Sequence, residues 1–382
     1  MSDYQILEGH ATPIGTSAFA SNAVLAGVSQ LNFRIFQGLN LSSLGMGTYL
    51  GDLSNTDDAL IESAVVQSIK SGAMNVIDTA LNYRAMKSEK SIGRALLRLA
   101  DAGMDRKGIF ISTKNGYITN DGDYPGVDLA EYIQRMFIEN GIIEPGDISS
   151  GYNVMNPNYI SRCIDKSLSN LHLSTIDLVY IHNAYESWYQ DVDSKTFFEM
   201  LAKVFEIYET YRKAGRIQFY GMATWTCFRA KQGAKDHLSL QQVVKIAESI
   251  GGSNHGFRFI QMPYNLLYFE ANSIRNQSLD GSGILYTPLE AASRLNIGVF
   301  ASVPLMQGRL LGGEYPDYPG APTGSKVGKI IQVIRSSPGI VSALIGQKRT
   351  EHLEENTKLA KIPILNSDQL QEAMSRLRIH LN

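Results

Sequence analysis

The chain has 382 residues, of which 44% are hydrophobic and 19% charged, and its formal net charge is −2. This balance is that of a globular protein long enough for one large domain or two ordinary ones. No long run of like charges indicates a nucleic-acid or membrane partner, so we expect neither.

The N-terminal residues and the cysteines predict a cytoplasmic protein without a signal peptide. The first basic residue is Arg34, so the N-terminus lacks the positive region of a secretory signal. The uncharged stretch 9–33 is interrupted by Pro13 and by polar residues, and it is too polar to span a bilayer. Cys163 and Cys227 have no metal-binding spacing, and a disulfide framework would need more cysteines.

The first elements in chain order are an N-terminal extension over residues 1–31 and a short hairpin over 33–41, centred on Gly38. We expect the hairpin to close the floor of the domain that follows. The sequence gives no function for the extension.

From residue 44 onward, short apolar runs rich in β-branched residues alternate with longer amphipathic stretches, which is typical of strand–helix units on a parallel sheet. The runs expected to be strands are 44–49, 74–79, 109–114, 176–182, 217–223, 258–264, 297–303 and 340–346. No G-x-G-x-x-G sequence follows the first run, so a closed barrel fits better than an open doubly wound sheet. We therefore predict a single (β/α)8 TIM barrel domain over residues 1–382.

Helix signals support this count. Asn156 and Pro157 are an N-cap and a first-turn proline, and they predict a helix that leads into the fourth strand. A helix from Thr350 should end before Pro363, and residues 367–381 should form a last helix.

A long insertion, residues 115–159, follows the third strand, where a connection of roughly 2 to 6 residues is usual. Asp128 and Glu131 predict the start of a short helix inside it, and Gly141 predicts its end. The residues expected on its buried face are Leu129, Tyr132, Ile133, Met136 and Phe137. We expect the insertion to form part of the substrate pocket, because loops at this end of a barrel shape the active site. The alternative is a decoration on the solvent side.

Four polar residues at strand ends form the candidate catalytic group. Asp78 ends the second strand, Lys114 the third and His182 the fourth, and Tyr83 follows Asp78 closely. A buried carboxylate needs a partner, and Lys114 on the adjacent strand supplies one. A phenol has a pKa of about 10, and a nearby ammonium eases its proton loss. Tyr83 can then protonate a carbonyl oxygen held by His182 while a hydride reaches the carbon.

The chain resembles the aldo-keto reductases in these residues and in the segments around them. The matching segments are Leu-Gly-Met-Gly-Thr at 44–48, Ile-Asp-Thr-Ala at 77–80 with Tyr83, Lys-Ser-Glu at 87–89, Ile-Ser-Thr-Lys at 111–114, Ile-Asp-Leu at 176–178 with His-Asn at 182–183, Gly-Arg-Ile at 215–217, Gln-Met at 261–262, Pro-Leu at 304–305 with Gln-Gly at 307–308, and Gly346 through Glu355 and Asn356. The resemblance covers residues 33 to 360 and implies a barrel that uses NAD(P)H without a metal. It also implies Asp78, Tyr83, Lys114 and His182 as the catalytic tetrad.

The same resemblance implies a set of residues that contact the cofactor. These are Gly47, Thr48, Asp78, Asn183, Thr224, Gln261, Ser302, Pro304, Leu305, Gln307, Gly308, Gly346, Gln347, Lys348, Arg349, His352, Glu355 and Asn356. Two positions depart from the family pattern. Ala223-Thr224 replaces the usual Ser-Asn, and Ser302 replaces the aromatic residue that stacks on nicotinamide. Trp225 is a candidate substitute.

The segment 346–349 favours NADPH over NADH. It opens a helix whose free amides can bind a phosphate, and Lys348 and Arg349 add positive charge. The alternative is a basic pair that merely caps a surface turn.

The function predicted from the sequence is NADPH-dependent reduction of an aldehyde or ketone. One alternative is a regulatory or partner-binding protein that retains the barrel and the cofactor. A metal-dependent hydrolase would need a His and carboxylate cluster that these strand ends lack. The sequence specifies neither the particular carbonyl substrate nor the oligomeric state.

Overall fold

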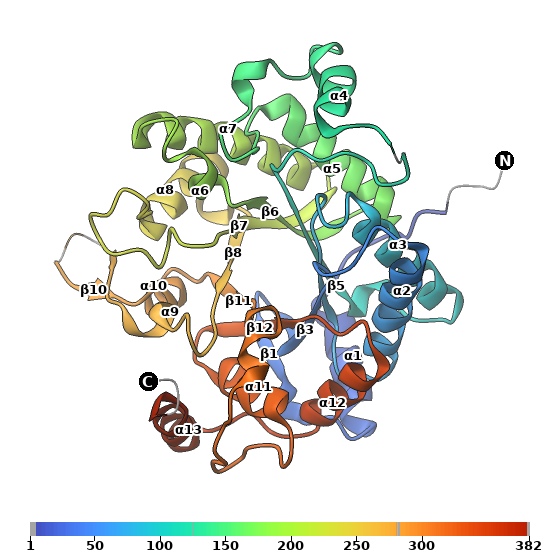
Figure 1. Cartoon of the computed structure of the whole chain (residues 1–382), viewed down its shortest axis with the longest axis vertical. Coiled ribbons are helices and arrows are strands. Elements are labelled where there is room, and N and C mark those ends of the chain that lie inside the picture. Colours follow the sequence, from blue (N-terminus) through green and yellow to red (C-terminus); the bar gives the residue numbers. More distant parts are fainter. Residues whose placement is uncertain (1–4, 125, 280, 282, 380–382) are drawn as a thin grey trace.

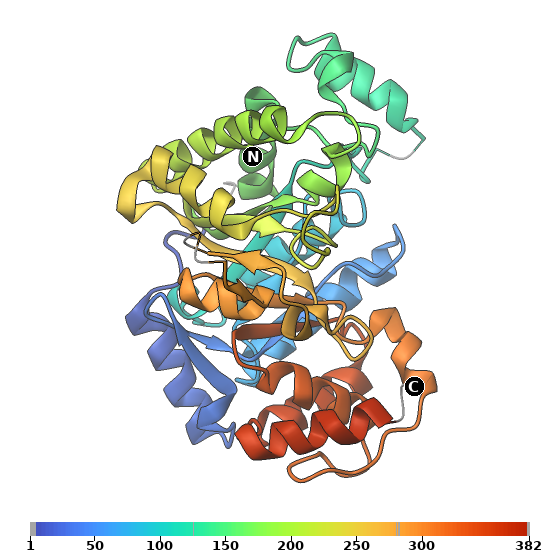
Figure 2. The same cartoon turned by 90° about the vertical axis from the view of Figure 1, so that its left-hand side faces the viewer.

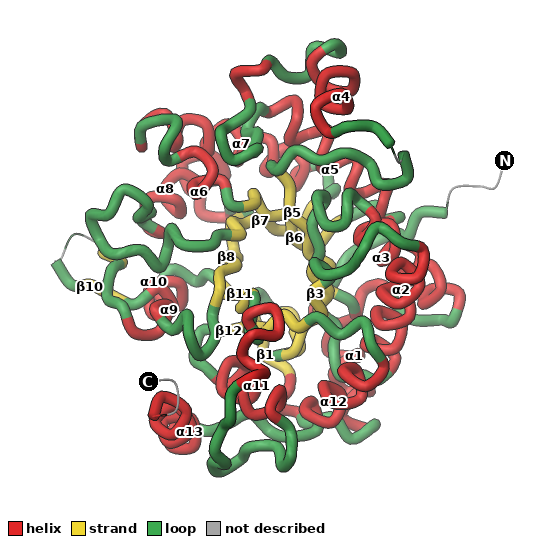
Figure 3. Tube along the Cα trace, in the orientation of Figure 1, coloured by secondary structure: helices red, strands yellow, loops and turns green. Residues whose placement is uncertain are grey.

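Eight parallel strands form a closed barrel surrounded by helices in the computed structural model, which describes residues 5–379 except 125, 280 and 282 (Figures 1 and 3). The strands follow the order β11-β12-β3-β4-β5-β6-β7-β8 around the barrel. Their bounds are β3 Leu44–Gly47, β4 Val76–Asp78, β5 Phe110–Asn115, β6 Ile176–His182, β7 Ile217–Ala223, β8 Phe257–Pro263, β11 Gly298–Ser302 and β12 Ile340–Ile345. The predicted (β/α)8 barrel is confirmed, and the fourth and fifth expected strands have the predicted bounds.

Helices that follow the strands cover the outside of the barrel. They are α2 Asn55–Lys70, α3 Lys87–Asp101, α5 Pro157–Leu171, α7 Ser194–Lys213, α8 Leu240–Gly251, α10 Pro288–Arg294, α11 Lys326–Ser336 and α12 Thr350–Ala360. The Asn156 side chain accepts a hydrogen bond from the Asn158 amide at 2.9 Å, which confirms the predicted start of α5. The expected last helix is α13, Ser367–Ile379; its predicted residues 380 and 381 lie outside the described part of the chain.

The floor of the barrel is closed by a hairpin, as expected. Strand β1, Phe33–Phe36, pairs antiparallel with β2, Leu39–Ser42, through a turn in which Gly38 has a φ of 77°. The Phe36 ring lies 5.0 Å from the ring of Phe259 on β8. A Cβ on Gly298 would approach Phe36 to 2.8 Å, so glycine permits this close contact. This end of the barrel is therefore packed, and the chemistry belongs at the other end.

The N-terminal extension packs beside this floor. Helix α1, Pro13–Leu25, follows a segment in which the Ala11 amide donates to Asp177 Oδ1 at 2.6 Å. Asp177 Oδ2 also accepts from Arg106 Nη2 at 2.6 Å and from the Ile111 amide at 2.8 Å. One buried carboxylate at the base of β6 thus joins three segments that are distant in sequence.

The insertion lies mainly on the outside of the barrel. Its helix α4, Leu129–Ile133, continues into a π-helix, Gln134–Ile138, beside α5 and away from the barrel axis (Figures 1 and 2). The Phe137 ring packs against Tyr159 of α5 at 5.2 Å. The expected burial of Met136 is wrong, since this residue is 47% exposed. The wider π-helical turn explains this, because side chains beyond Ile133 no longer follow α-helical spacing.

We expect Asp177→Asn to lower the free energy of unfolding by about 3 kcal/mol or more, because it leaves the buried Arg106 guanidinium without a counter-charge. Denaturant titration followed by circular dichroism measures the change. Asp101→Asn, at an exposed position of α3, is the control and should cost less than about 0.5 kcal/mol. Equal losses in the two variants would contradict a special role for the Asp177 cluster.

Candidate active site

The four predicted catalytic residues lie together at the carboxyl ends of β4, β5 and β6. Lys114 Nζ donates to Asp78 Oδ2 at 2.6 Å and to the Thr79 carbonyl at 2.6 Å. The ammonium lies 4.6 Å from the centroid of the Tyr83 ring. The centroids of Tyr83 and His182 are 5.8 Å apart, with the rings nearly perpendicular. Adjacent parallel strands thus bring a carboxylate, an ammonium, a phenol and an imidazole close together.

Asp78 is held by three side chains. Its Oδ1 accepts from Ser112 Oγ at 2.7 Å and from Gln261 Nε2 at 3.0 Å, while Oδ2 accepts from Lys114. Ser112 comes from β5 and Gln261 from β8, across the barrel. Three donors therefore fix the orientation of the carboxylate, and it serves as the anchor of the ammonium.

The surroundings shift the pKa of three of these groups. Burial by itself would lower the pKa of Lys114, but attraction to Asp78 and contact with Tyr83 outweigh it, so the pKa is raised. Burial raises the pKa of Tyr83, and the Lys114 charge opposes that rise. Burial and the Lys114 charge together hold the pKa of His182 well below its ordinary value. At neutral pH the site thus contains an ammonium, a protonated phenol and a neutral imidazole.

A cavity of about 650 Å³ opens above these residues. Tyr83 and His182 line it, whereas Lys114 is fully buried behind its wall. Most of the predicted cofactor residues also line it: Gly47, Thr48, Asp78, Asn183, Thr224, Gln261, Ser302, Pro304, Leu305, Gln307, Gly308, Gly346, His352, Glu355 and Asn356. The cavity therefore extends from the catalytic group to α12.

Three predicted cofactor residues lie beside the cavity rather than in its wall. Gln347 is buried, donates to Ser68 Oγ at 2.6 Å and accepts from Asn356 Nδ2 at 2.8 Å. Lys348 Nζ is paired with Asp57 Oδ2 at 2.9 Å. Arg349 is exposed at the position before α12. Among the described residues no partner of its guanidinium is found, and the Gln347 side chain turns toward α2.

Other residues of the cavity were not identified from the sequence. Tyr49, Leu50 and Tyr117 line it from loops without a periodic pattern, and Leu311 lines it from the short 3-10 helix Met306–Gly312. Tyr117 is the one described residue of the insertion that lines the cavity, whereas the inserted helix lines no part of it. Phe137 of this segment packs against Tyr159 of α5 instead. Trp225, the candidate substitute for the aromatic residue that stacks on nicotinamide, lines the cavity. Ser302 also lines it, and its side chain has no ring that could stack.

The geometry defines a barrel with a Tyr–Lys–Asp–His group in a dinucleotide-sized cavity. Within the described part of the chain, no group of three or more His, Cys, Asp or Glu residues is arranged to hold a metal ion. The helices of that same part include none that is long and apolar enough to cross a membrane.

The family model of the Aldo/keto reductase family matches residues 43–329. The chain therefore belongs to the aldo/keto reductase family, and it is an NAD(P)H-dependent oxidoreductase of that type. The comparison with curated proteins finds no match.

Solved structures share the fold. An aldo-keto reductase from Bacillus halodurans, in its holo form, is 18% identical with a TM-score of 0.57, covering 91% of this chain and 96% of its own. A Klebsiella pneumoniae aldo/keto reductase in complex with NADP and acetate is 17% identical with a TM-score of 0.55, covering 91% and 95%. An aldo-keto reductase from the same organism in complex with NADPH is also 17% identical, with a TM-score of 0.56 and the same coverage.

Proposed function

We propose that the protein reduces an aldehyde or ketone with NADPH and that Tyr83 is the general acid. Membership of the family supports carbonyl reduction in general. The observation that carries the finer proposal is the placement of Tyr83 beside the Lys114–Asp78 ion pair, at the bottom of the cavity and facing His182.

The donor set fits a nicotinamide dinucleotide. The cavity reaches from His182 to His352, Glu355 and Asn356 on α12, and its volume of about 650 Å³ suits a ligand of this size. The nearest atom to a Cβ built on Gly346 would be the Gly47 carbonyl oxygen, 4.0 Å away. The backbone at Gly346 therefore has free space beside it, which a cofactor could occupy. Gln261 lies at the catalytic end, and the segment 346–349 lies at the other. The cofactor would supply the hydride to the carbonyl carbon.

In the proposed reaction Tyr83 transfers its proton to the carbonyl oxygen, which becomes the hydroxyl of the alcohol. Lys114 stabilises the tyrosinate that remains, and Asp78 keeps Lys114 charged. His182 is neutral and orients the carbonyl oxygen. Its Nδ1 is buried and has no hydrogen-bond partner among the described residues, so the ring can face the cavity only through its other atoms.

NADPH is favoured over NADH by the charges at the far end of the cavity. Lys348 and Arg349 precede α12, whose first amides can bind a phosphate. Asp57 holds Lys348 close to the segment that lines the cavity.

The cytoplasm is our proposed compartment, which the two buried free cysteines support.

The mouth of the cavity supports an uncharged substrate with an apolar body. Tyr49, Leu50, Trp225 and Leu311 line it and yet are between 38% and 53% exposed. A ligand that covered them would remove apolar surface from water. The described lining residues include no lysine or arginine that could pair with an anionic substrate.

Replacing Tyr83 with Phe should lower kcat for carbonyl reduction by about 100-fold to 10,000-fold, because the proton donor is lost. NADPH affinity should hardly change, and a fluorescence titration measures it. Tyr49→Phe is the control, since it removes a hydroxyl from the neighbouring ring and should have a much smaller effect. Near-normal turnover by Tyr83→Phe would exclude this residue as the acid. Cofactor binding without any turnover by the wild type would favour a regulatory protein.

The double variant Lys348→Ala/Arg349→Ala should weaken NADPH much more than NADH. Each charge-assisted contact to the 2′-phosphate contributes roughly 1.5 to 3 kcal/mol. Fluorescence titration of both cofactors gives the ratio of their affinities. Lys358→Ala/Lys361→Ala, at the other end of α12, removes the same charge and is the control. If NADPH and NADH weaken equally, the phosphate binds elsewhere.

A pair of aldehydes that differ in charge at the para position, an ester and its carboxylate, tests the apolar mouth. We expect kcat/KM for methyl 4-formylbenzoate to exceed that for 4-formylbenzoate by about tenfold or more, because the carboxylate would lose water without gaining a cation. Leu50→Ala should reduce kcat/KM for the ester and narrow this ratio. A preference for the carboxylate would show that a cation enters the site, and it would overturn the proposed substrate class.

A further inference from the structure

The backbone directly after Tyr83 has an unusual conformation. Arg84, Ala85 and Met86 have φ angles of 51°, 48° and 71°, so three successive residues with a Cβ are left-handed. This region is disfavoured for L-residues other than glycine, and single occurrences are the norm. The segment ends at Lys87, where α3 begins. Surrounding contacts must therefore hold the turn that carries the proposed acid.

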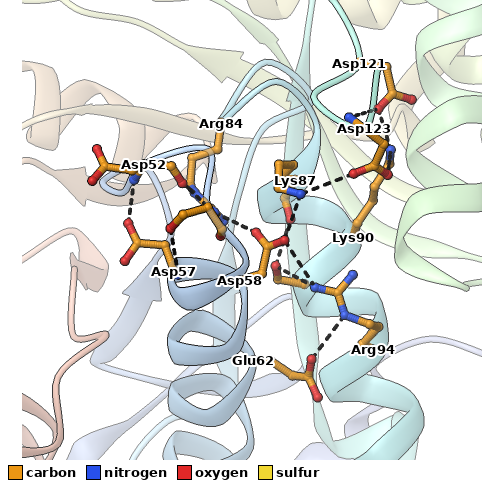
Figure 4. Close-up of polar contacts among 12 residues, drawn as sticks. Asp52, Asp57, Asp58, Glu62, Arg84, Lys87, Lys90, Arg94, Asp121 and Asp123 are labelled. Carbon is orange, nitrogen blue, oxygen red and sulfur yellow. Dashed lines mark hydrogen bonds and ion pairs between the residues drawn. The ribbon is translucent and has the colours of Figure 1, made fainter. Parts of the chain in front are cut away.

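The Arg84 side chain supplies the strongest of these contacts. Its Nε and Nη2 donate to the Asp52 carbonyl at 2.9 and 2.7 Å, and Nη2 also donates to Asp58 Oδ1 at 2.6 Å (Figure 4). The side chain is only 1% exposed. A guanidinium fork of this kind fixes both distance and direction, which a flexible ammonium does not.

The Asp52 loop connects this fork to the other side of Tyr83. The Asp52 amide donates to Asp57 Oδ2 at 2.5 Å, so Asp57 and Arg84 bind the amide and the carbonyl of the same loop residue. A Cβ on Gly51 would lie 2.8 Å from Asp57 Oδ2 and 3.1 Å from Arg84 Nε, which shows how closely these groups fit. The loop carries Tyr49, whose ring packs edge-on against the Tyr83 ring at 5.0 Å.

Asp58 is itself kept in place by further charges. Its Oδ2 lies 2.9 Å from Lys87 Nζ, and Lys87 also pairs with Asp123 of the insertion at 3.2 Å (Figure 4). Asp58 lies in the first turn of α2, where the helix dipole favours a carboxylate. Arg94 approaches Asp58 only to 3.9 Å and does not contact the Asp52 loop.

We propose that Arg84 is a positioning residue for Tyr83. Its guanidinium holds the left-handed turn behind the phenol and the Tyr49 loop beside it, so that the hydroxyl stays between Lys114 and His182. This inference rests on the proposed function, in which Tyr83 is the acid. An error of about 1 Å in the position of a catalytic group can reduce the rate by about 100-fold, so such a clamp has a measurable effect.

Arg84→Gly separates the fork from the backbone strain. Glycine accepts the left-handed conformation, so this variant loses the guanidinium without retaining an unfavourable φ. We expect kcat to fall by about 10-fold to 100-fold while the Kd for NADPH stays within about threefold. Arg84→Lys keeps the charge without the fork and should restore part of kcat. Arg94→Ala removes a neighbouring arginine of the same network and should leave kcat unchanged.

The pKa of Tyr83 is a readout that should not change if Arg84 contributed only to the stability of the fold. The titratable groups that face its ring are Lys114, Asp78, Tyr49 and His182, and Lys114 is the cation that lowers its pKa. A phenol that moves out of its place loses burial, which raises its pKa, and loses the Lys114 charge, which lowers it, so its pKa should shift. The Cζ resonance in ¹³C-tyrosine-labelled protein, assigned by its loss in Tyr83→Phe, reports this titration without any substrate.

The outcomes separate the two proposals. A shifted Tyr83 pKa and a lower kcat in folded Arg84→Gly support the clamp. An unchanged Tyr83 pKa in that variant overturns it, whether or not the wild type reduces any carbonyl that is offered. Loss of turnover in Tyr83→Phe combined with full turnover in Arg84→Gly also overturns the clamp but leaves the proposed function intact. Thermal unfolding and circular dichroism establish that each variant is folded.

Discussion

The ion pair between Lys114 and Asp78 is the interaction on which the rest of the site depends. An ammonium that is fully buried in a barrel wall stays charged only if a carboxylate lies at contact distance, and Asp78 lies at 2.6 Å. Asp78 is in turn fixed by Ser112 and Gln261, so residues of three strands share one charge cluster. The cluster holds Tyr83 near a cation, and burial together with the Lys114 charge lowers the pKa of His182 and keeps it uncharged.

The floor of the barrel contributes to stability, and the opposite end carries the chemistry. At the floor, aromatic rings, the hairpin and the Asp177 cluster pack together and join distant segments. At the mouth, loops of different origin surround a cavity whose depth is polar and whose rim is apolar. The polar depth suits the transfer of a proton and a hydride, while the rim suits the body of the substrate. The long insertion contributes Tyr117 to this cavity and otherwise extends the helical layer near α5.

Much of the fold was predictable because buried parallel strands are apolar runs with helices between them. Asp78, Lys114 and His182 were also recognisable, since polar residues at the ends of such runs meet at one edge of the sheet. Tyr49 and Arg84 were not, because their contacts depend on the path of a loop that has no periodic pattern. The outward turn of Met136 depends on a π-helix, which spacing alone does not reveal. The sequence likewise placed Gln347 near the cofactor but could not show that its side chain points to Ser68.

The loop between β3 and α2 is held through its main chain. Arg84 binds the carbonyl of residue 52 and Asp57 binds its amide, while the exposed side chain of residue 52 contributes to neither bond. Almost any amino acid can therefore occupy position 52, except proline, which has no amide hydrogen to donate. Position 51 has no room for a side chain. Apart from Gly51, this loop is constrained in its length and not in its amino-acid sequence. Related proteins that keep the clamp would therefore be recognised by the spacing from Gly51 to Asp57 and Arg84. A similar residue at position 52 would not be needed.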